Sequence, residues 1–290
     1  MTYCVAMRLD AGLVFLSDSR TNAGVDQIST FRKMTVFEHP GERVMVLMSA
    51  GNLAVTQAVR QILCERISPT DASVWNVKTM FHAVRILGDA IREVHERDAA
   101  SLKEFGIEFN ANFILGGQIR GEGLRLFQVY SAGNFIEATH ENPYFQVGEA
   151  KYGKPIIDRV IQPTTPLDEG AKCALISMDS TLRSNISVGL PLDLLVYEAD
   201  SLRVTKFVQI DGSNQYMNMI RNTWGARLKQ VFSEIPDPTW RDSVAASGAP
   251  RLETDVTQPV RAPLPPFLAS DTGSVPVQLV AGTSGGRAPE

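Results

Sequence analysis

The sequence predicts an α+β fold in which two antiparallel sheets stack face to face and helices cover their outer faces. Strand-like apolar runs come in pairs joined by short turns, which is typical of antiparallel hairpins. Segments with helical spacing also come in pairs, so the order is strands, two helices, strands, two helices, strands and one helix. A doubly wound nucleotide-binding fold would alternate single strands with single helices, and no glycine-rich phosphate loop follows any predicted strand.

The N-terminal half contains four predicted strands and two predicted helices. Short apolar runs bounded by turn residues predict strands over 2–8, 12–20, 31–39 and 42–50. A helix over 52–66 follows. The next helix carries apolar residues three and four positions apart: Val77, Met80, Phe81, Val84, Leu87, Ile91 and Val94.

The C-terminal half repeats the pattern of strands followed by paired helices. Its predicted elements are strands over 106–119 and 123–133, shorter strands to about Val147, helices from about Ala150 and Leu167, and strands over 192–199 and 203–210. The glycine-rich stretch LGGQIRG is interpreted as a hairpin between strands. Ser213 is the predicted cap of a last helix, which carries Met217, Ile220, Trp224, Leu228 and Val231.

Composition changes abruptly near Pro236 and divides the chain. Nine of the 16 prolines lie in 236–290, and hydrophobic periodicity ends there. We therefore expect one domain over 1–235 and a mostly disordered tail, rich in Pro, Gly and Ser, over 236–290.

Charge and hydropathy exclude several classes of partner. The net charge is -4, from 28 basic and 32 acidic residues, so neither nucleic acid nor an acidic membrane is expected as a partner. The sequence shows no signal peptide and no run of ~20 apolar residues, which a membrane helix would need. These features predict a cytoplasmic protein.

The cysteines and histidines predict neither a metal nor a cofactor. Cys4, Cys64 and Cys173 are odd in number and far apart, which disfavours a disulfide framework or a zinc site and indicates thiols in a reducing compartment. The four histidines share no ligand spacing.

The turn LDAG places Asp18 close to Thr2. If Asp10 and Ala11 form a two-residue turn, Thr2 lies opposite Ser19 on the neighbouring strand; a three-residue loop would place Arg20 there instead. In either register Asp18 lies within a residue or two of Thr2 across the ladder.

Thr2 combines a nucleophile and a base once the initiator methionine is removed, which we expect because threonine is small. Its α-amino group would then have a pKa near ~8 and could accept a proton from its own hydroxyl. A nearby cation, held by a carboxylate, would favour the deprotonated forms. Lys33 and Asp18 are the candidates for these two roles.

Four segments together resemble the β-type subunits of the proteasome superfamily: the strand-initial Thr2, SDSR, FRKM and SAGNLAVTQAV. Over residues 2–235 the chain is most similar to the Anbu family of bacterial ancestral β-subunits. This resemblance implies the four-layer αββα sandwich of N-terminal nucleophile hydrolases. It also implies Thr2 as nucleophile, with Asp18 and Lys33 beside it. It further implies Gly51 as the oxyanion-hole N–H and Ser49 in the pocket for the residue before the cleaved bond.

Two later positions depart from the proteasome pattern. Glu149, in VGEA, stands where proteasome subunits have an active-site serine. In RSNISVG, Ser187 is retained as a site residue, but Ser184 replaces an aspartate. We treat Glu149 and Ser184 as modulating positions and expect only weak hydrolysis of generic peptides.

The resemblance implies a threonine hydrolase that cleaves peptide or amide bonds and self-associates into a ring-like or helical homo-oligomer. The sequence leaves an ATP-dependent unfoldase partner open. One alternative is a noncatalytic scaffold like the α-type proteasome subunits, although these have an N-terminal extension with a helix, which we do not expect here. The other alternative is an amidase that acts on a small molecule.

Overall fold

The elements follow the predicted order. The structure, a computed structural model, describes residues 2–23, 27–67 and 71–238. The strands are β1 (Tyr3–Leu9), β2 (Gly12–Asp18), β3 (Arg20–Ala23), β4 (Gln27–Thr30), β5 (Met34–His39), β6 (Arg43–Gly51), β7 (Ala111–Ile119), β8 (Arg125–Val129), β9 (Phe135–Glu137), β10 (Tyr144–Gly148), β11 (Leu192–Glu198) and β12 (Lys206–Ile210). The helices are α1 (Leu53–Glu65), α2 (Met80–Glu104), α3 (Ala150–Val160), α4 (Leu167–Ser184) and α5 (Gln215–Glu234). Met1–Ile235 is one compact unit, and the predicted tail lies outside the described residues beyond Pro238.

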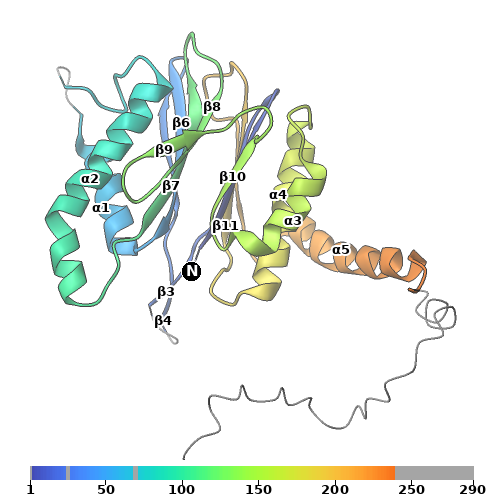
Figure 1. Ribbon diagram of the computed structural model, residues 1–290. Coiled ribbons are helices and arrows are strands. Elements are labelled where there is room, and N and C mark those ends of the chain that lie inside the picture. Colours follow the sequence, from blue (N-terminus) through green and yellow to red (C-terminus); the bar gives the residue numbers. More distant parts are fainter. Residues whose placement is uncertain (1, 24–26, 68–70, 239–290) are drawn as a thin grey trace, which may run out of the picture. The chain divides into compact units, whose positions relative to one another are not determined.

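Ten of the strands build two antiparallel sheets that face each other. The first sheet has the order β10-β1-β2-β11-β12, and the second has the order β5-β6-β7-β8-β9, while β3 and β4 form a separate hairpin. Figure 1 shows α1 and α2 on the outside of the second sheet and α3 and α4 on the outside of the first. The chain therefore has a mixed α+β fold with antiparallel sheets.

The space between the sheets is filled by apolar side chains from both. Phe15 and Leu195 of the first sheet pack with Val46, Ile114 and Leu126 of the second. Alternate residues of β2 point to the opposite face of the sheet, where Val14 and Leu16 belong to the core under α3 and α4. Because both faces are covered, every residue of β2 is buried.

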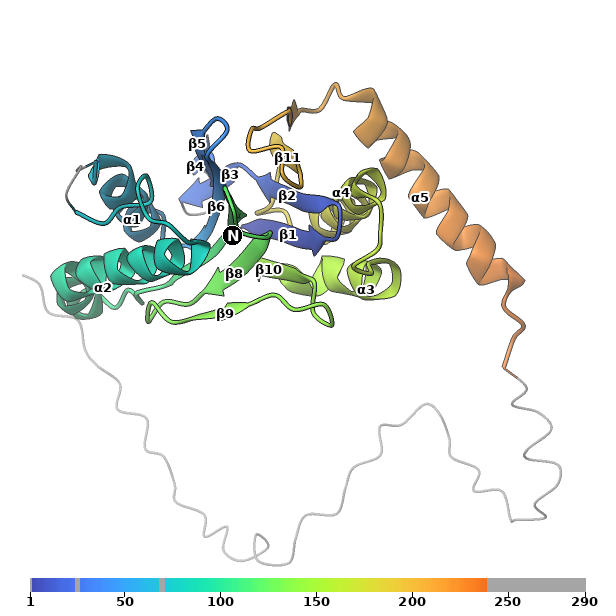
Figure 2. The ribbon, with the colours of Figure 1, turned by 90° about the horizontal axis from the view of Figure 1, so that it is seen from above.

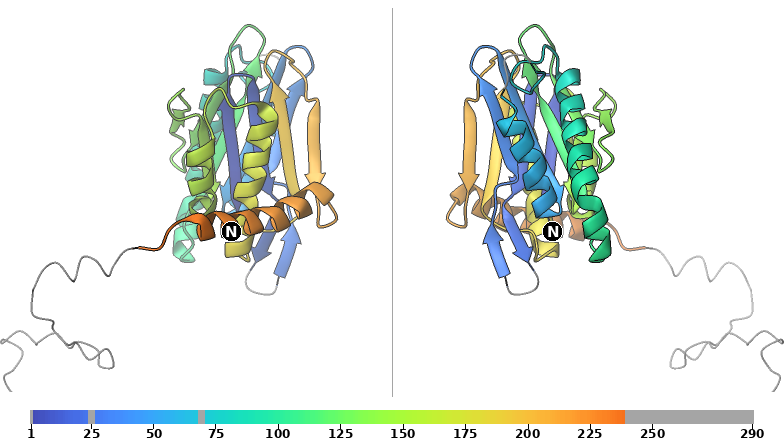
Figure 3. Two further views of the ribbon diagram at one scale, coloured as in Figure 1. Left: turned by 90° about the vertical axis from the view of Figure 1, so that its right-hand side faces the viewer. Right: turned by 90° about the vertical axis from the view of Figure 1, so that its left-hand side faces the viewer.

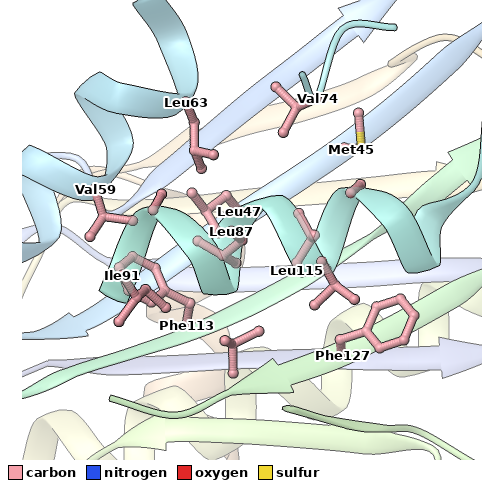
Figure 4. Packing of buried hydrophobic residues seen from close by; sticks show 14 of the residues in the cluster. Met45, Leu47, Val59, Leu63, Val74, Leu87, Ile91, Phe113, Leu115 and Phe127 are labelled. Carbon is pink, nitrogen blue, oxygen red and sulfur yellow. The ribbon is translucent and has the colours of Figure 1, made fainter. Parts of the chain in front are cut away.

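A second core lies between the second sheet and helices α1 and α2. Figure 4 shows its side chains converging from both helices and from β6, β7 and β8. Asn52 caps α1, since its side chain accepts hydrogen bonds from the N–H groups of Ala54 and Val55. Thr79 caps α2 in the same way through the N–H of His82. These caps fix where both helices leave the sheet.

Helix α5 is fastened at its first half only. Met217 and Ile220 are buried against the body. The buried Asp179 of α4 accepts hydrogen bonds from Arg183 at 3.0 Å and from Arg221 at 3.2 Å. Figure 2 shows the second half of α5 extending away from the sheets, and Figure 3 shows the helix lying across the direction of the strands. Among the described residues, no helix has both the length and the apolar character needed to cross a membrane.

The predicted hairpin at LGGQIRG is confirmed: β7 pairs antiparallel with β8, Arg120 and Gly121 lie in the turn between them, and Gly116 and Gly117 belong to β7. Two local predictions were wrong. Asn214, not Ser213, caps α5, because its side chain accepts the N–H of Met217. Lys33 lies just before β5 instead of within a strand, and the β3–β4 hairpin was not expected.

Packing between the sheets explains the glycine inside β7. A Cβ at Gly116 would lie 2.7 Å from Cδ1 of Leu126 and 2.9 Å from Cζ of Phe15 in the facing sheet. A larger residue would push the two sheets apart.

We expect Gly116→Ala to lower the free energy of unfolding by about 1–3 kcal/mol, because overpacking strains a filled core. Urea denaturation measures this change. Gly123→Ala is the matched control, since a Cβ there meets no atom within 4 Å. Equal stability of the two variants would contradict the proposed contact between the sheets.

Candidate active site

A buried ion pair joins the end of β2 to the segment that leads into β5. Lys33 Nζ lies 2.7 Å from Oδ1 of Asp18, and both side chains are almost fully buried. Lys33 also donates to the carbonyl of Arg20 at 2.6 Å. Asp18 accepts two backbone N–H groups as well, from Tyr3 at 3.0 Å and from Gly189 at 3.4 Å. Protein groups thus hold both charges of the pair in place.

The environment of Asp18 acts on its pKa in two directions. Burial raises the pKa of this carboxyl group above its ordinary value, because the charged form loses its hydration. The Lys33 ammonium and the two N–H donors oppose that rise. Desolvation is the larger of these effects, so the net shift of the Asp18 pKa is upward.

The two-residue turn at Asp10-Ala11 sets the register that brings Thr2 and Asp18 together. Leu9 pairs with Gly12 and Cys4 with Ser17, so the two-residue alternative from the sequence is confirmed. Continued by two residues, this register places Ser19 opposite Thr2. The N–H of Tyr3, the residue after Thr2, reaches Asp18 directly.

Strand β10 holds Thr2 from the other side. Glu149 donates its N–H to the Thr2 carbonyl at 2.8 Å. Gly148 has a φ of +84°, and a Cβ there would lie 1.9 Å from the Thr2 carbonyl oxygen. Only glycine fits this close approach. The backbone of Thr2 is therefore fixed, while its side chain stays partly exposed.

Thr2 opens into a cleft of about 910 Å³. Of the residues singled out from the sequence, Thr2, Lys33, Ser49, Gly51 and Glu149 line it. Asp18 lies buried beneath Lys33 and contributes through that contact.

Two of the predicted site residues lie elsewhere. Ser184 is exposed at the end of α4 and Ser187 is half-buried after it, and neither lines the cleft. The Ser187 N–H donates to the side chain of Asn185.

Gly51 lines the cleft where β6 ends and α1 begins. Gly51 has a φ of +123°, and a Cβ there would collide with the carbonyl of Asn110. Helix α1 starts two residues later and has no acidic residue in its first turn. The N-terminus of a helix favours negative charge, so this edge of the cleft can stabilise an oxyanion.

Sequence reasoning missed the far wall of the cleft. Leu53, Thr56, Gln57 and Arg60 line it from α1. These residues follow Gly51 and are spaced three and four positions from one another. This spacing is a signal that could have identified them as one helix face. Asn110 and Asn112 of the segment around the start of β7 also line the cleft, and no local pattern indicates them.

Several solved structures similar to this chain are of Anbu proteins. Anbu (ancestral β-subunit) from Yersinia bercovieri is 54% identical, with a TM-score of 0.78 over 82% of this chain and 99% of that one. Anbu from Hyphomicrobium sp. strain MC1 is 48% identical, with a TM-score of 0.75 over 81% and 99%. The helical assembly of the Anbu complex from Pseudomonas aeruginosa is 47% identical, with a TM-score of 0.78 over 81% and 98%. No protein-family model and no curated protein matches the chain.

We expect Asp18→Asn to lower the free energy of unfolding by about 3–5 kcal/mol, because it leaves the Lys33 ammonium buried without a counter-charge. Thermal or urea denaturation measures the loss. Asp158→Asn is the control: its partner Lys154 lies 3.0 Å away, but both side chains are about half exposed. That pair should contribute no more than about 1 kcal/mol. A small effect at Asp18 would show that the attraction between Asp18 and Lys33 contributes little to the free energy of unfolding.

Proposed function

This chain belongs to the Anbu family of proteasome-like ancestral β-subunits, and we propose that it is a threonine-type N-terminal nucleophile hydrolase of peptide or amide bonds. The observation that supports the proposal most directly is the buried Asp18–Lys33 pair next to Thr2 in an open cleft. The two facing sheets with helices outside agree with the four-layer αββα sandwich of that hydrolase class. A noncatalytic scaffold would not require an ammonium group buried at this position.

The reaction begins with the Thr2 hydroxyl, after removal of Met1 has freed the α-amine. The hydroxyl oxygen attacks the substrate carbonyl and its proton passes to the amine. The tetrahedral intermediate collapses, the proton moves to the leaving nitrogen, and an acyl ester remains on Thr2. Water then attacks this ester as the amine accepts one of its protons; the amine passes that proton to Thr2 Oγ1 as the ester bond breaks, which releases the acid and restores the hydroxyl.

Lys33 and Gly51 act on the charge that develops during these steps. The Lys33 ammonium favours the neutral amine and the alkoxide-like form of the hydroxyl through its positive charge. Asp18, 2.7 Å from Lys33 Nζ, holds that ammonium in place. The N–H of Gly51, at the edge of the cleft, donates to the carbonyl oxygen as it becomes negative.

Glu149 is the reason to expect weak hydrolysis of generic peptides. Its side chain is only 16% exposed and its residue lines the cleft beside Thr2. A carboxylate near the Thr2 amine favours the protonated, non-basic form. Lys151, whose Nζ lies 3.9 Å from the Glu149 carboxylate, partly offsets this effect. Ser184 is too exposed to act in the same way.

The chain is further proposed to self-associate through α5. A stripe of apolar residues begins with the buried Met217 and Ile220 and continues along the uncovered half of the helix. Trp224, Leu228 and Val231 extend it, and Leu228 and Val231 are about half exposed. A helical assembly is described for the Anbu complex from Pseudomonas aeruginosa. Contact with another subunit would remove this apolar stripe from water.

The cytoplasm is the proposed location. All three cysteines are free thiols, and Cys4 and Cys173 are buried. Unpaired cysteines fit a reducing compartment.

Treatment with a peptide epoxyketone, followed by intact-mass analysis and peptide mapping, tests the nucleophile. We expect a single adduct on Thr2, in a chain that lacks Met1. Lys33→Ala should slow its formation by about 10²–10⁴-fold, because base assistance is lost, whereas Lys154→Ala, a surface control, should not. Circular dichroism verifies that the variants fold. Retained Met1, or an adduct elsewhere, would refute the mechanism.

In the same assay Glu149→Ser should accelerate the labelling of Thr2, because the carboxylate that favours the protonated amine is removed.

Native mass spectrometry and light scattering at micromolar concentration test the assembly. We expect the wild type to form multi-subunit species and the double variant Leu228→Gln/Val231→Gln to form smaller ones, since the apolar stripe is interrupted. Lys229→Gln, on the same exposed half of α5, is the control. The melting temperature of the isolated subunit should change little. A strictly monomeric wild type would contradict the proposal.

A further inference from the structure

The helix wall of the cleft presents one arginine toward the site. Leu53, Thr56, Gln57 and Arg60 form a single face of α1. Arg60 lies about 10 Å along the axis from Leu53. Side chains of a helix lean toward its N-terminus, so the Arg60 side chain extends back over the turn that carries Thr56 and Gln57. That direction leads toward the Gly51 end of the cleft.

Arg60 has no partner within the part of the chain that the structure describes. Its neighbours three and four positions away are Thr56, Gln57, Leu63 and Cys64, and none of them is acidic. The side chain is exposed and forms neither an ion pair nor a hydrogen bond with any described residue. Its charge is therefore available to a ligand in the cleft.

The other charged residues that line the cleft are already engaged. Lys33 is held by Asp18. The guanidinium carbon of Arg32 lies 5.8 Å from the ring centre of Phe207, on β12 of the other sheet. The carboxylate of Glu149 lies 3.9 Å from Lys151 Nζ. Arg60 is the charged residue of this lining that has neither an ion pair, a hydrogen bond nor a ring contact with any described residue.

The floor of the same cleft, on β5 and β6, is neutral and can donate hydrogen bonds. Thr35 of β5 pairs with Leu47 of β6, and Ser49 follows two residues later on the same face. All three line the cleft. The hydroxyls of Thr35 and Ser49 have no hydrogen-bond partner among the described residues. The floor thus combines two free hydroxyls with one apolar side chain.

From this arrangement we propose that the cleft selects substrates with an acidic side chain directly before the cleaved bond; the inference rests on the proposed hydrolase function. The carboxylate binds the Arg60 guanidinium, whose planar fork matches two carboxylate oxygens. The hydroxyls of Thr35 and Ser49 donate to it from the floor. A lysine or arginine side chain is repelled by Arg60, and a neutral one gains no charge-assisted hydrogen bond.

Four peptide epoxyketones that differ only in the last residue, Glu, Gln, Leu or Lys, provide the test. The rate of Thr2 modification is followed by intact mass on the full-length protein. We expect the Glu probe to react about 10- to 100-fold faster than the isosteric Gln probe, the range of a hydrogen bond to a charged group. Raised ionic strength should reduce this ratio.

Variants of Arg60 assign the selectivity to its charge. Arg60→Ala should bring the Glu-to-Gln ratio close to one, and Arg60→Glu should favour the Lys probe. Arg85→Ala, an exposed arginine of α2 outside the cleft, should keep the wild-type ratio. If all four probes modify Thr2 at the same rate, or if the Glu-to-Gln rate ratio is unchanged in Arg60→Ala, the acidic preference alone is overturned. No adduct with any of the four probes would overturn the hydrolase function as well.

Discussion

The contact on which the site depends is the ion pair between Asp18 and Lys33. Its carboxylate ends a strand of the first sheet, and its ammonium immediately precedes a strand of the second. Neither charge would tolerate burial alone, so the pair persists only while the apolar layer between the sheets keeps them stacked. The chemistry near Thr2 is therefore a product of sheet packing. Changes in the inter-sheet core, such as at Phe15 or Gly116, act on the same geometry.

Local patterns in the sequence carry much of the fold and part of the site. The turn at Asp10-Ala11 determines which residues of β1 and β2 meet, so the proximity of Thr2 and Asp18 could be predicted from a few adjacent residues. The paired helices could also be predicted, because helical spacing is a pattern among residues close together in the sequence. Local chemistry was less reliable at element ends, where Ser213 and Asn214 are both suitable caps and only the folded backbone selects one.

The remainder of the site depends on contacts between distant segments. Glu149 reaches Thr2 because β10 pairs with β1, with Tyr3 opposite Gly148, although the two lie far apart in the sequence. Arg60 and Asn110 come together in one cleft only when α1 packs on the second sheet. Ser184 shows the converse: a position matched by motif alone ends on the surface. Hydrophobic periodicity in the sequence carries no information on such contacts between distant segments.

Strand β1 is an inner strand, hydrogen-bonded to β2 along one edge and to β10 along the other. The residue proposed to carry out the chemistry is thus attached to one of the best-protected segments of the chain. Flexible loops can fluctuate without affecting stability, but exposing the amides of β1 requires breaking two ladders at once. Slow hydrogen exchange in β1 would accompany an intact site, and loss of the site would coincide with global unfolding. Regulation of such a site would have to act on access to the cleft, because the nucleophile itself cannot be withdrawn separately.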